Sequence, residues 1–335
     1  MNIYVLEPPA TSKNGVQRIY GGNGTNKSDF RKAPIDVLWM SGYLRKNGFD
    51  NIFHDSNNSR ETFEDLQNHF KVNEPDVIFF STSTCTIYSD VRVAEIAKSI
   101  NPNCICVAFG THVMELTNET LDESPQVDIG IYSNEWELVA LDIVKNYEDI
   151  SKAKGIVYRD EKGSLVRSLP HPPLVNYDDL GFPAHDKLDQ SLYADPTMRR
   201  SPKTMVQFSR SCIAKCSFCC QPAFFGNVMN RSVDSIIEEL KWVKELGFKE
   251  VFINDATFTY DHDWNKKIFQ RMIDERIDIS WWCTTRAHCL NEEILDLMKR
   301  AGCHTIGVGF ESADDQVLKN IKKGVRLDYI KDAVN

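Results

Sequence analysis

The chain has 335 residues, of which 42% are hydrophobic and 26% are charged. This is an ordinary globular composition with enough apolar mass for two domains. Its 39 Lys and Arg residues against 48 Asp and Glu residues give a net charge of -9, so no broad basic field indicates a nucleic-acid partner. The N-terminal stretch MNIYVLEPPATSKNG lacks the basic and apolar regions of an export signal, and no apolar run is long enough to span a bilayer. We therefore expect a cytoplasmic protein.

The first half of the chain alternates strand-like and helix-like segments. We expect strands at 2–8, 51–56, 76–84, 104–110 and 127–132, and helices at 34–48, 89–100 and 134–146. Pro34 marks the start of the first helix and Gly48 its end. The strands are continuous apolar runs, which is typical of parallel strands covered on both faces. The pattern predicts an α/β domain over residues 1–150, with a doubly wound, Rossmann-like parallel sheet.

The loops that follow these strands are rich in small hydroxyl residues, Gly and Asn: EPPATSKNG, HDSNNS, STSTCTIYSD, FGTHVME and YSNEWE. Sheets of this class bind ligands at the carboxyl ends of their strands, so the loops favour a polar ligand site. Loops are polar for general reasons as well, and the composition leaves both interpretations open.

The pattern changes over residues 151–203. A small hairpin turning at Lys162-Gly163 and a Pro-rich connection are expected there. Over 204–335 a second alternation follows, with strands at 204–210, 250–258, 279–285 and 305–312 and helices at 232–247, 263–276, 291–302 and 314–320. This predicts a β/α barrel or an open parallel sheet. Four strands cannot close a barrel, so we expect a TIM-like barrel truncated after its fourth strand, an open sheet, or completion by a partner.

Four cysteines directly follow the first strand of this second part: Cys212, Cys216, Cys219 and Cys220. In a reducing compartment such a cluster indicates a metal or redox site rather than disulfides. A zinc site would need both Cys219 and Cys220, and adjacent side chains cannot easily face one tetrahedral centre. The spacing C-x3-C-x2-C matches three irons of a [4Fe-4S] cubane and leaves the fourth iron open. The other cysteines are interpreted mostly as small core residues: Cys85, Cys104, Cys106, Cys283, Cys289 and Cys303.

The cysteine spacing, with Phe218 before the last cysteine, resembles the signature of radical S-adenosylmethionine (SAM) enzymes. The segments NDATF, TTRAHCLNEEILDLMKRAGC and GVGFES follow in the order that this family shows, so the resemblance covers about residues 204–335. It implies that Cys212, Cys216 and Cys219 hold the cluster and that Cys220 does not. It also implies one-electron reduction of SAM to methionine and a 5'-deoxyadenosyl radical, which is chemistry of the cofactors.

The same resemblance implies six contacts to SAM: Phe218, Asn254, Asp255, Arg286, Glu311 and Ser312. Arg286 suits the methionine carboxylate, because a guanidinium binds a carboxylate through two parallel hydrogen bonds. Three alternatives remain. Asp255 would cap a turn, Ser312 would be a helix N-cap, and Arg286 would pair on the surface with Glu292 or Glu293.

Residues 2–200 resemble the cobalamin-binding subgroup of this family, through EPP, PIDVLWMSGYLRKNGFD, STSTCT, FGTHVM and NEWE. The implied cobalamin contacts are Ser83, Thr84, Gly110, Thr111, His112 and Glu135. The chain departs from the usual pattern of this subgroup in two loops. The fourth loop usually has two glycines where this chain has Phe109–His112, and the last loop usually has Gly-Glu-Gly-Glu where this chain has Ser133–Glu137. No D-x-H-x-x-G motif supplies an axial histidine, and His112 is alternatively an ordinary loop residue.

The leading hypothesis is a radical SAM enzyme that uses cobalamin to transfer a methyl group to a carbon centre, on a small-molecule or peptide substrate. The family also implies an electron donor of the flavodoxin or ferredoxin type. A cobalamin-dependent cyclase or oxidative enzyme, and a non-catalytic iron–sulfur ligand sensor, are the alternatives. A methylthiotransferase ranks lower, because Cys85, Cys104 and Cys106 do not resemble the second cysteine triad that it needs.

Overall fold

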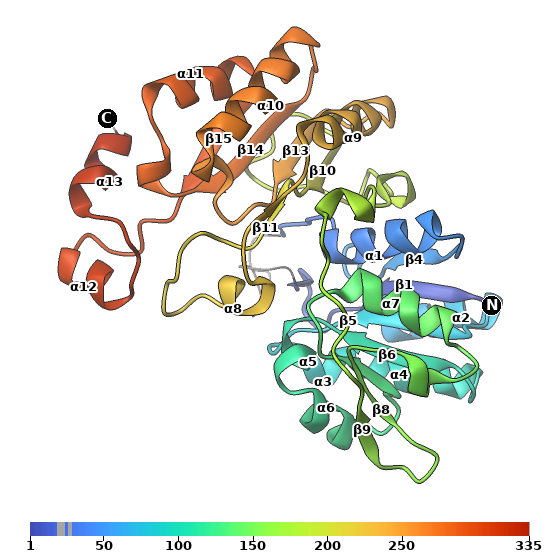
Figure 1. The fold of residues 1–335 in the computed structure, drawn as a ribbon. Coiled ribbons are helices and arrows are strands. Elements are labelled where there is room, and N and C mark those ends of the chain that lie inside the picture. Colours follow the sequence, from blue (N-terminus) through green and yellow to red (C-terminus); the bar gives the residue numbers. More distant parts are fainter. Residues whose placement is uncertain (19–23, 26–28, 335) are drawn as a thin grey trace. The chain divides into compact units, whose positions relative to one another are not determined.

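The computed structural model describes residues 1–18, 24–25 and 29–334. The chain divides into two compact units (Figure 1). Unit 1 contains Met1–Val175 and Leu180–Asp195, and unit 2 contains Asn176–Asp179 and Pro196–Asn335. In the described part of the chain, no helix has both the length and the apolar character that crossing a membrane requires.

Unit 1 is built on a seven-stranded sheet in the order β4-β1-β5-β6-β7-β8-β9. The strands are β1 (Ile3–Glu7), β4 (Ile52–Asp55), β5 (Val77–Ser81), β6 (Ile105–Phe109), β7 (Ile129–Ile131), β8 (Ile156–Arg159) and β9 (Leu165–Arg167). The pairings from β4 to β7 are parallel, whereas β8 and β9 are antiparallel. The expected hairpin therefore exists, but it extends the sheet of unit 1 rather than standing in a separate connection.

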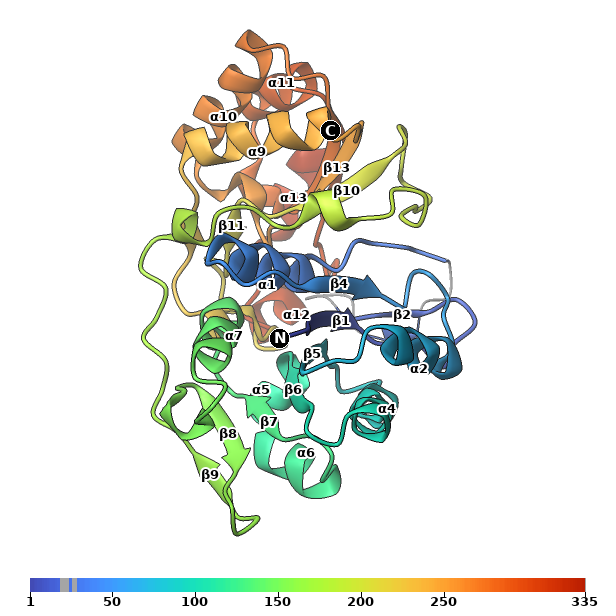
Figure 2. The same ribbon diagram turned by 90° about the vertical axis from the view of Figure 1, so that its right-hand side faces the viewer.

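Both faces of this sheet are covered by helices, which confirms the doubly wound α/β fold. Successive residues of β1 point to opposite faces: Ile3 and Val5 belong to one buried cluster, Tyr4 and Leu6 to the other. Helices α1 (Ile35–Lys46) and α7 (Trp136–Lys145) pack on the first face. Helices α2 (Phe63–Val72) and α4 (Arg92–Ile100) pack on the second (Figure 2).

Helix α2 was not expected from the sequence, although it carries a recognisable start signal. The Thr62 side chain accepts from the backbone N–H of Asp65, and the Asp65 carboxylate accepts from the backbone N–H of Thr62. Such a reciprocal capping box stabilises the first turn of a helix. The helix then buries Leu66 and Phe70, four residues apart and thus on the same side.

Unit 2 is built on a four-stranded, fully parallel sheet in the order β10-β13-β14-β15. The strands are β10 (Lys203–Val206), β13 (Glu250–Ile253), β14 (Ser280–Thr285) and β15 (Cys303–Val308). Helices α9 (Val233–Glu245), α10 (His262–Asp274) and α11 (Glu292–Arg300) lie side by side along one face, as both ribbon views show. This confirms the predicted strand–helix repeat with four parallel strands.

The remaining elements are short. They are β2 (Val16–Gln17), β3 (Gly24–Thr25), β11 (Ser209–Arg210), β12 (Met229–Asn230), α3 (Ile87–Asp90), α5 (Thr111–Glu115), α6 (Thr117–Glu123), α8 (Gln221–Phe225), α12 (Asp315–Asn320) and α13 (Leu327–Val334). Turns of 3-10 helix occur at Ile150–Lys152, Tyr177–Leu180, His185–Lys187, Phe258–Tyr260 and Ala287–Cys289.

Candidate functional site

The cysteine loop lies between two short strands that fix both of its ends. Ser209 and Arg210 of β11 pair in antiparallel register with Asn230 and Met229 of β12. The loop opens at Ser211, which has a left-handed backbone conformation (φ 72°). Its chain therefore turns sharply after the strand pair, at the carboxyl end of the β10 segment, where parallel β/α folds place their chemistry.

A pocket of about 390 Å³ opens at the carboxyl ends of the unit 2 strands. Three cysteines of the loop, Cys212, Cys216 and Cys219, all line it. Cys220 is exposed and is not among the residues that line this pocket in the described chain. The other lining residues are Ala214, Phe218, Ala256, Thr257, Thr284, Thr285, Arg286, Gly307, Val308, Gly309, Glu311 and Lys323. The structure thus separates the three cysteines of the motif from the fourth.

Arg286 brings a buried positive charge to this pocket. Its side chain follows β14, the residue is 5% exposed, and Nη1 lies 3.5 Å from Cys216 Sγ. Its Nε is buried with no hydrogen-bond partner among the described residues. The surface pairing considered for Arg286 is not formed in the described residues, since Glu293 pairs with Lys266 at 2.7 Å. A buried guanidinium with an unmade hydrogen bond suits an anionic ligand in this pocket.

Glu311 and Lys323 form an ion pair in the lining of the same pocket. Lys323 Nζ donates to Glu311 Oε1 at 2.8 Å, and the Lys323 side chain is 7% exposed. Lys323 Nζ also lies 5.9 Å from the ring centre of Phe218. Nothing in the sequence pattern distinguished Lys323 from the neighbouring Lys322, so sequence reasoning missed it.

Of the six expected SAM contacts, the structure brings Phe218, Arg286 and Glu311 together in this pocket. Asn254, Asp255 and Ser312 are not among its lining residues in the described chain; Ala256 and Thr257 occupy that part instead. The alternative interpretation, in which Ser312 is the N-cap of α12, is wrong. The N-cap is Asp314, because its side chain accepts hydrogen bonds from the backbone N–H groups of Gln316 and Val317.

The Asp255 carboxylate is engaged inside the protein. It accepts hydrogen bonds from the backbone N–H of Phe208 at 2.8 Å and from the Ser209 hydroxyl at 2.7 Å. Burial raises the pKa of Asp255 to about 6, although these hydrogen bonds oppose the shift. The carboxylate therefore ties the β13 loop to the start of the cysteine loop, and does not cap its own turn.

The donor set of the pocket fits a [4Fe-4S] cluster. Three thiols face one hollow together with a buried guanidinium, and Cys212 Sγ lies 3.3 Å from Thr257 Oγ1. Within the described ranges, no three His, Cys, Asp or Glu side chains stand close enough to share a single metal ion. A cubane does not need such convergence, because each thiolate binds a different iron.

The residues expected to contact cobalamin follow the carboxyl ends of the unit 1 strands. Ser83 is buried and its hydroxyl lies 2.8 Å from Thr86 Oγ1, while His112 Nδ1 lies 3.2 Å from the Thr84 hydroxyl. Thr111 begins α5, and Glu135 precedes α7. Gly110, after β6, lies close to the residue that follows the neighbouring strand β5, since a Cβ at Gly110 would stand 2.4 Å from the Thr82 carbonyl oxygen. Ser83, Gly110 and Glu135 are buried, whereas Thr84 is exposed, so these residues are not all equally open to a ligand.

A buried charge cluster, which sequence reasoning missed, lies at the same edge. Arg18 donates to Glu7 at 2.9 Å and to Asp90 at 2.8 Å, and all three side chains are at most 5% exposed. Burial raises the pKa of both carboxyl groups, and the Arg18 charge opposes this. The single Arg18 charge lies between these two buried carboxyl groups, and their contacts fix Arg18 against the strand ends.

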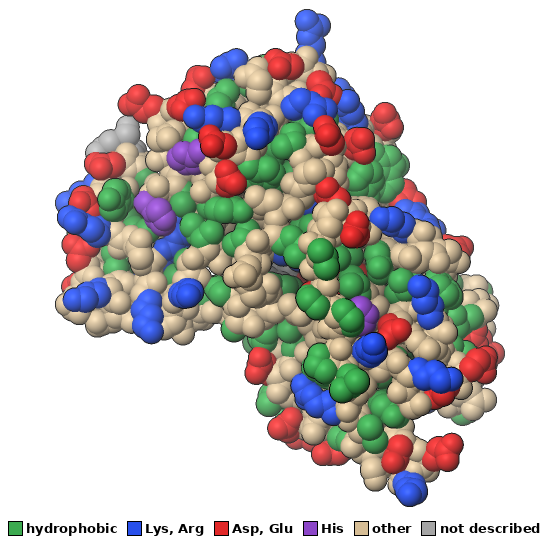
Figure 3. Space-filling view, in the orientation of Figure 1, with side chains coloured by type: hydrophobic (Ala, Val, Ile, Leu, Met, Phe, Trp, Pro, Cys, Tyr) green, Lys and Arg blue, Asp and Glu red, His purple; other side chains and the backbone are tan. Residues whose placement is uncertain are grey.

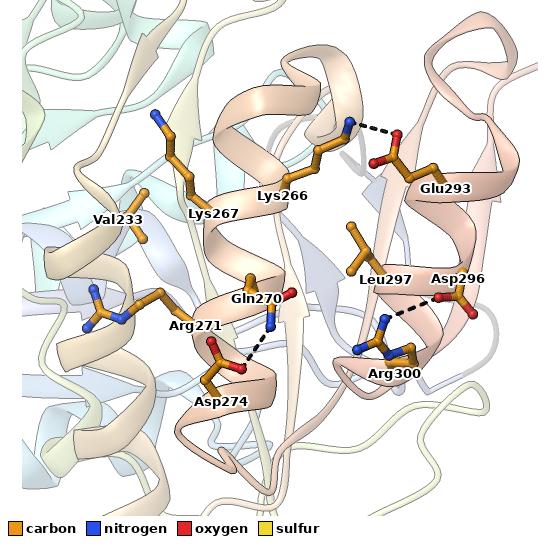
Figure 4. Close-up of a pocket in the computed structure, with 10 residues that line it drawn as sticks. All are labelled: Val233, Lys266, Lys267, Gln270, Arg271, Asp274, Glu293, Asp296, Leu297 and Arg300. Atoms are coloured by element: carbon orange, nitrogen blue, oxygen red, sulfur yellow. Dashed lines mark hydrogen bonds and ion pairs between the residues drawn. The ribbon is translucent and has the colours of Figure 1, made fainter.

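A larger hollow of about 770 Å³ lies on the outer helices α9, α10 and α11, and all of its lining residues belong to these helices. Figure 4 shows two ion pairs in its lining: Lys266 faces Glu293, and Arg300 faces Asp296. No cysteine and no strand end contributes to it. We interpret it as a solvated groove between surface helices.

Comparison with known proteins gives consistent results. Residues 206–335 match the radical SAM superfamily. An uncharacterized methyltransferase of Pyrococcus horikoshii is 31% identical over 339 residues, covering 100% of this chain and 70% of the relative. The anaerobic magnesium-protoporphyrin IX monomethyl ester cyclase of Rubrivivax gelatinosus is 25% identical over 311 residues, covering 90% of this chain and 56% of the relative.

A solved structure is also similar in fold. The cobalamin-dependent S-adenosylmethionine radical enzyme OxsB, with aqua-cobalamin and S-adenosylmethionine bound, has a TM-score of 0.77 at 17% identity. The match covers 99% of this chain and 47% of that chain. At this identity the likeness shows the fold alone. The chain thus spans 70%, 56% and 47% of the three proteins that it resembles here.

Proposed function

The chain belongs to the radical SAM superfamily, and from this premise we propose that it is a cobalamin-dependent methyltransferase acting on a carbon centre. The observation that carries the proposal is the pocket in which Cys212, Cys216 and Cys219 face Arg286 and Glu311. When bound there, a [4Fe-4S] cluster supplies the electron that cleaves SAM to methionine and a 5'-deoxyadenosyl radical.

The side chains of the pocket have distinct roles in this proposal. The three cysteines hold the cluster, and Arg286 binds the methionine carboxylate through its buried guanidinium. Glu311, held by Lys323, accepts hydrogen bonds from the ribose hydroxyls. Phe218 lines the pocket beside these groups and adds apolar surface to it. The Asp255 carboxylate fixes the backbone around Phe208.

Cobalamin use rests on unit 1 and on the relatives. The similar enzyme OxsB is cobalamin-dependent, and the relative from Pyrococcus horikoshii, 31% identical, is named a methyltransferase. Ser83, Thr84, Gly110, Thr111, His112 and Glu135 would contact the macrocycle at the strand ends. The close approach at Gly110 fits this, because a backbone without a side chain lets a flat ligand come near the sheet edge.

A cobalamin-dependent cyclase is the second candidate, favoured by the likeness to the magnesium-protoporphyrin IX monomethyl ester cyclase. The methylthiotransferase alternative gains no support from the cysteines of unit 1. Cys104 and Cys106 are fully buried in the sheet core, and Cys85 is exposed on a loop. A non-catalytic sensor would not explain why two buried cations, Arg286 and Lys323, line the pocket.

The test uses anaerobically reconstituted full-length protein with SAM and dithionite. We expect 5'-deoxyadenosine and methionine in the parent protein and in Cys220→Ala, and neither product in Cys216→Ala. Product formation in Cys216→Ala, or its loss in both variants, would contradict the cluster assignment. Retention of hydroxocobalamin on gel filtration tests the cobalamin part separately, and its loss would leave SAM cleavage intact.

A further inference from the structure

A group of exposed lysines lies beside the cysteine loop. Lys215 stands in the loop between Cys212 and Cys216, and Lys319 and Lys322 stand at the end of α12. We call these three residues the lysine patch. The two segments are joined where the backbone N–H of Ser217 donates to the carbonyl of Ile321 at 2.9 Å. The patch is therefore attached directly to the residue that follows Cys216.

The charge of the patch is not neutralised by neighbouring side chains. The stretch QVLKNIKKGVRL contains four basic residues in a chain whose net charge is -9. Lys323 pairs with Glu311 and Arg326 with Asp328, which leaves Lys319 and Lys322 outside these pairs. None of the three patch lysines forms an ion pair or a side-chain hydrogen bond among the described residues. Figure 3 shows Lys and Arg side chains following one another over α12 and the cysteine loop, along the lower left margin. On the outer helices, by contrast, most basic residues are paired.

Exposed apolar side chains accompany the lysines. Ile213 is 45% exposed and Phe218 58% exposed on the loop, and Val317 is 42% exposed on α12. Apolar groups with a charged rim are the usual composition of a protein interface. Transient redox complexes need only a small contact area and depend strongly on charge complementarity.

We propose that the lysine patch is the docking surface for a small acidic protein that carries a one-electron cofactor. This inference rests on the proposed function, which requires one electron to enter at the cysteine loop. A negatively charged donor would be attracted to the one part of the described surface where unpaired lysines adjoin that loop, and would dock on Ile213 and Val317. One electron leaves the reduced cofactor of the donor and enters the cluster.

The experiment uses a flavodoxin as the probe and full-length, cluster-loaded protein. The test variant is Lys319→Glu with Lys322→Glu. The control variant is Lys267→Glu with Lys299→Glu, which reverses the same charge at exposed positions on α10 and α11. Lys267 carries no marked interaction in the groove of Figure 4. Calorimetric titration at low salt measures the dissociation constant for oxidised flavodoxin, and stopped-flow absorbance measures electron transfer from reduced flavodoxin.

We expect the test variant to lose at least about tenfold in both affinity and transfer rate, with the difference closing at high salt. The control variant should match the parent protein. Equal losses in both variants, or flavodoxin binding that salt does not weaken, would overturn the proposal. So would a test variant that binds flavodoxin normally but has lost affinity for an oligonucleotide, since the patch would then serve nucleic acid.

Dithionite separates this inference from the proposed function. It is a small reductant that needs no docking surface, so the test variant should still cleave SAM at the parent rate when dithionite is present. If dithionite supports no cleavage even in the parent protein, the proposed function fails. If it supports cleavage in all proteins while flavodoxin binds the test variant and the parent equally, the docking surface alone is refuted.

Discussion

Lys323 donates a hydrogen bond to Glu311 across 2.8 Å within the pocket that the three cysteines line. Gly309 makes room for this pair, because a Cβ there would stand 2.9 Å from Glu311 Oε1 and 3.0 Å from Lys323 Nζ. Glu311 itself has a left-handed backbone conformation (φ 61°), which turns the chain directly after β15. The glycine, the turn and the lysine together fix where the carboxylate lies.

Replacing Lys323 with methionine should weaken SAM binding by about tenfold, or about 1.4 kcal/mol. Glu311 would lose its charged partner, and its carboxylate, 36% exposed, would turn toward water. Lys323→Arg should restore part of the affinity, and Lys322→Met is the matched control because Lys322 is exposed and does not line the pocket. Anaerobic calorimetry measures the dissociation constant. Equal affinities for the parent protein and Lys323→Met would show that the pair does not position Glu311.

The fold was largely predictable because its strands are apolar on both faces. Ile3–Glu7 and Val77–Ser81 are buried throughout, and such runs stand out in a sequence. Helix α2 could have been found from Thr62 and Asp65, since a capping box is a local signal. The pairing of β8 with β7 could not have been found in this way, because the sequence pattern of a hairpin does not indicate which sheet edge the hairpin joins.

The site was predictable in part for a similar reason. The cysteine triad is encoded by spacing within eight residues, Cys212 to Cys219, and the structure keeps it together. Asp255 shows the limit: it follows a strand as expected, but its carboxylate turns to Phe208 and Ser209. Burial of Lys323 depends on how α12 returns to the loop. Tertiary contacts of this kind leave no periodic trace in the sequence.

Gly110→Ala should destabilise the protein by about 3 kcal/mol or more, because its φ is 119° and the new Cβ would stand 2.4 Å from the Thr82 carbonyl oxygen. Gly48→Ala is the matched control, since its φ is 87° but nothing lies within 4 Å of a Cβ there. That variant should cost about 1 kcal/mol through backbone strain alone. Scanning calorimetry compares the two. Equal shifts of the unfolding temperature would mean that the close approach to Thr82 carries no cost.

Arg286→Gln should lower the midpoint potential of the bound cluster by on the order of 50 mV. The guanidinium lies 3.5 Å from Cys216 Sγ, and a nearby positive charge favours the reduced, more negative cluster. Arg286→Lys keeps the charge and should keep most of the potential. Arg200→Gln is the control, because Arg200 pairs with the exposed Asp278 in the same unit. Redox titration followed by electron paramagnetic resonance measures the values, and an unchanged or higher potential in Arg286→Gln would refute the argument.

Asp255 should make the stability of the protein depend on pH. Burial raises its pKa to about 6 in the folded state from its ordinary value of 3.8, so the folded protein binds the proton more tightly than the unfolded chain. The stabilising contribution is complete below the unfolded pKa and is lost as the pH rises through the folded pKa. Between about pH 5 and about pH 7 the parent protein should therefore lose about 1 kcal/mol relative to Asp255→Asn.

The asparagine variant isolates this effect, because its amide can still accept from the Phe208 N–H and can donate to the Ser209 hydroxyl without a charge. Burial also raises the pKa of Asp55 to about 6, but that residue is present in both proteins and its contribution cancels in the difference. Thermal unfolding of both proteins across this range, without added SAM, gives the measurement. A difference in unfolding temperature that stays constant with pH would show that Asp255 does not take up a proton on folding. If the parent protein instead gained stability relative to Asp255→Asn as the pH rises, the pKa of Asp255 would be lowered by folding rather than raised.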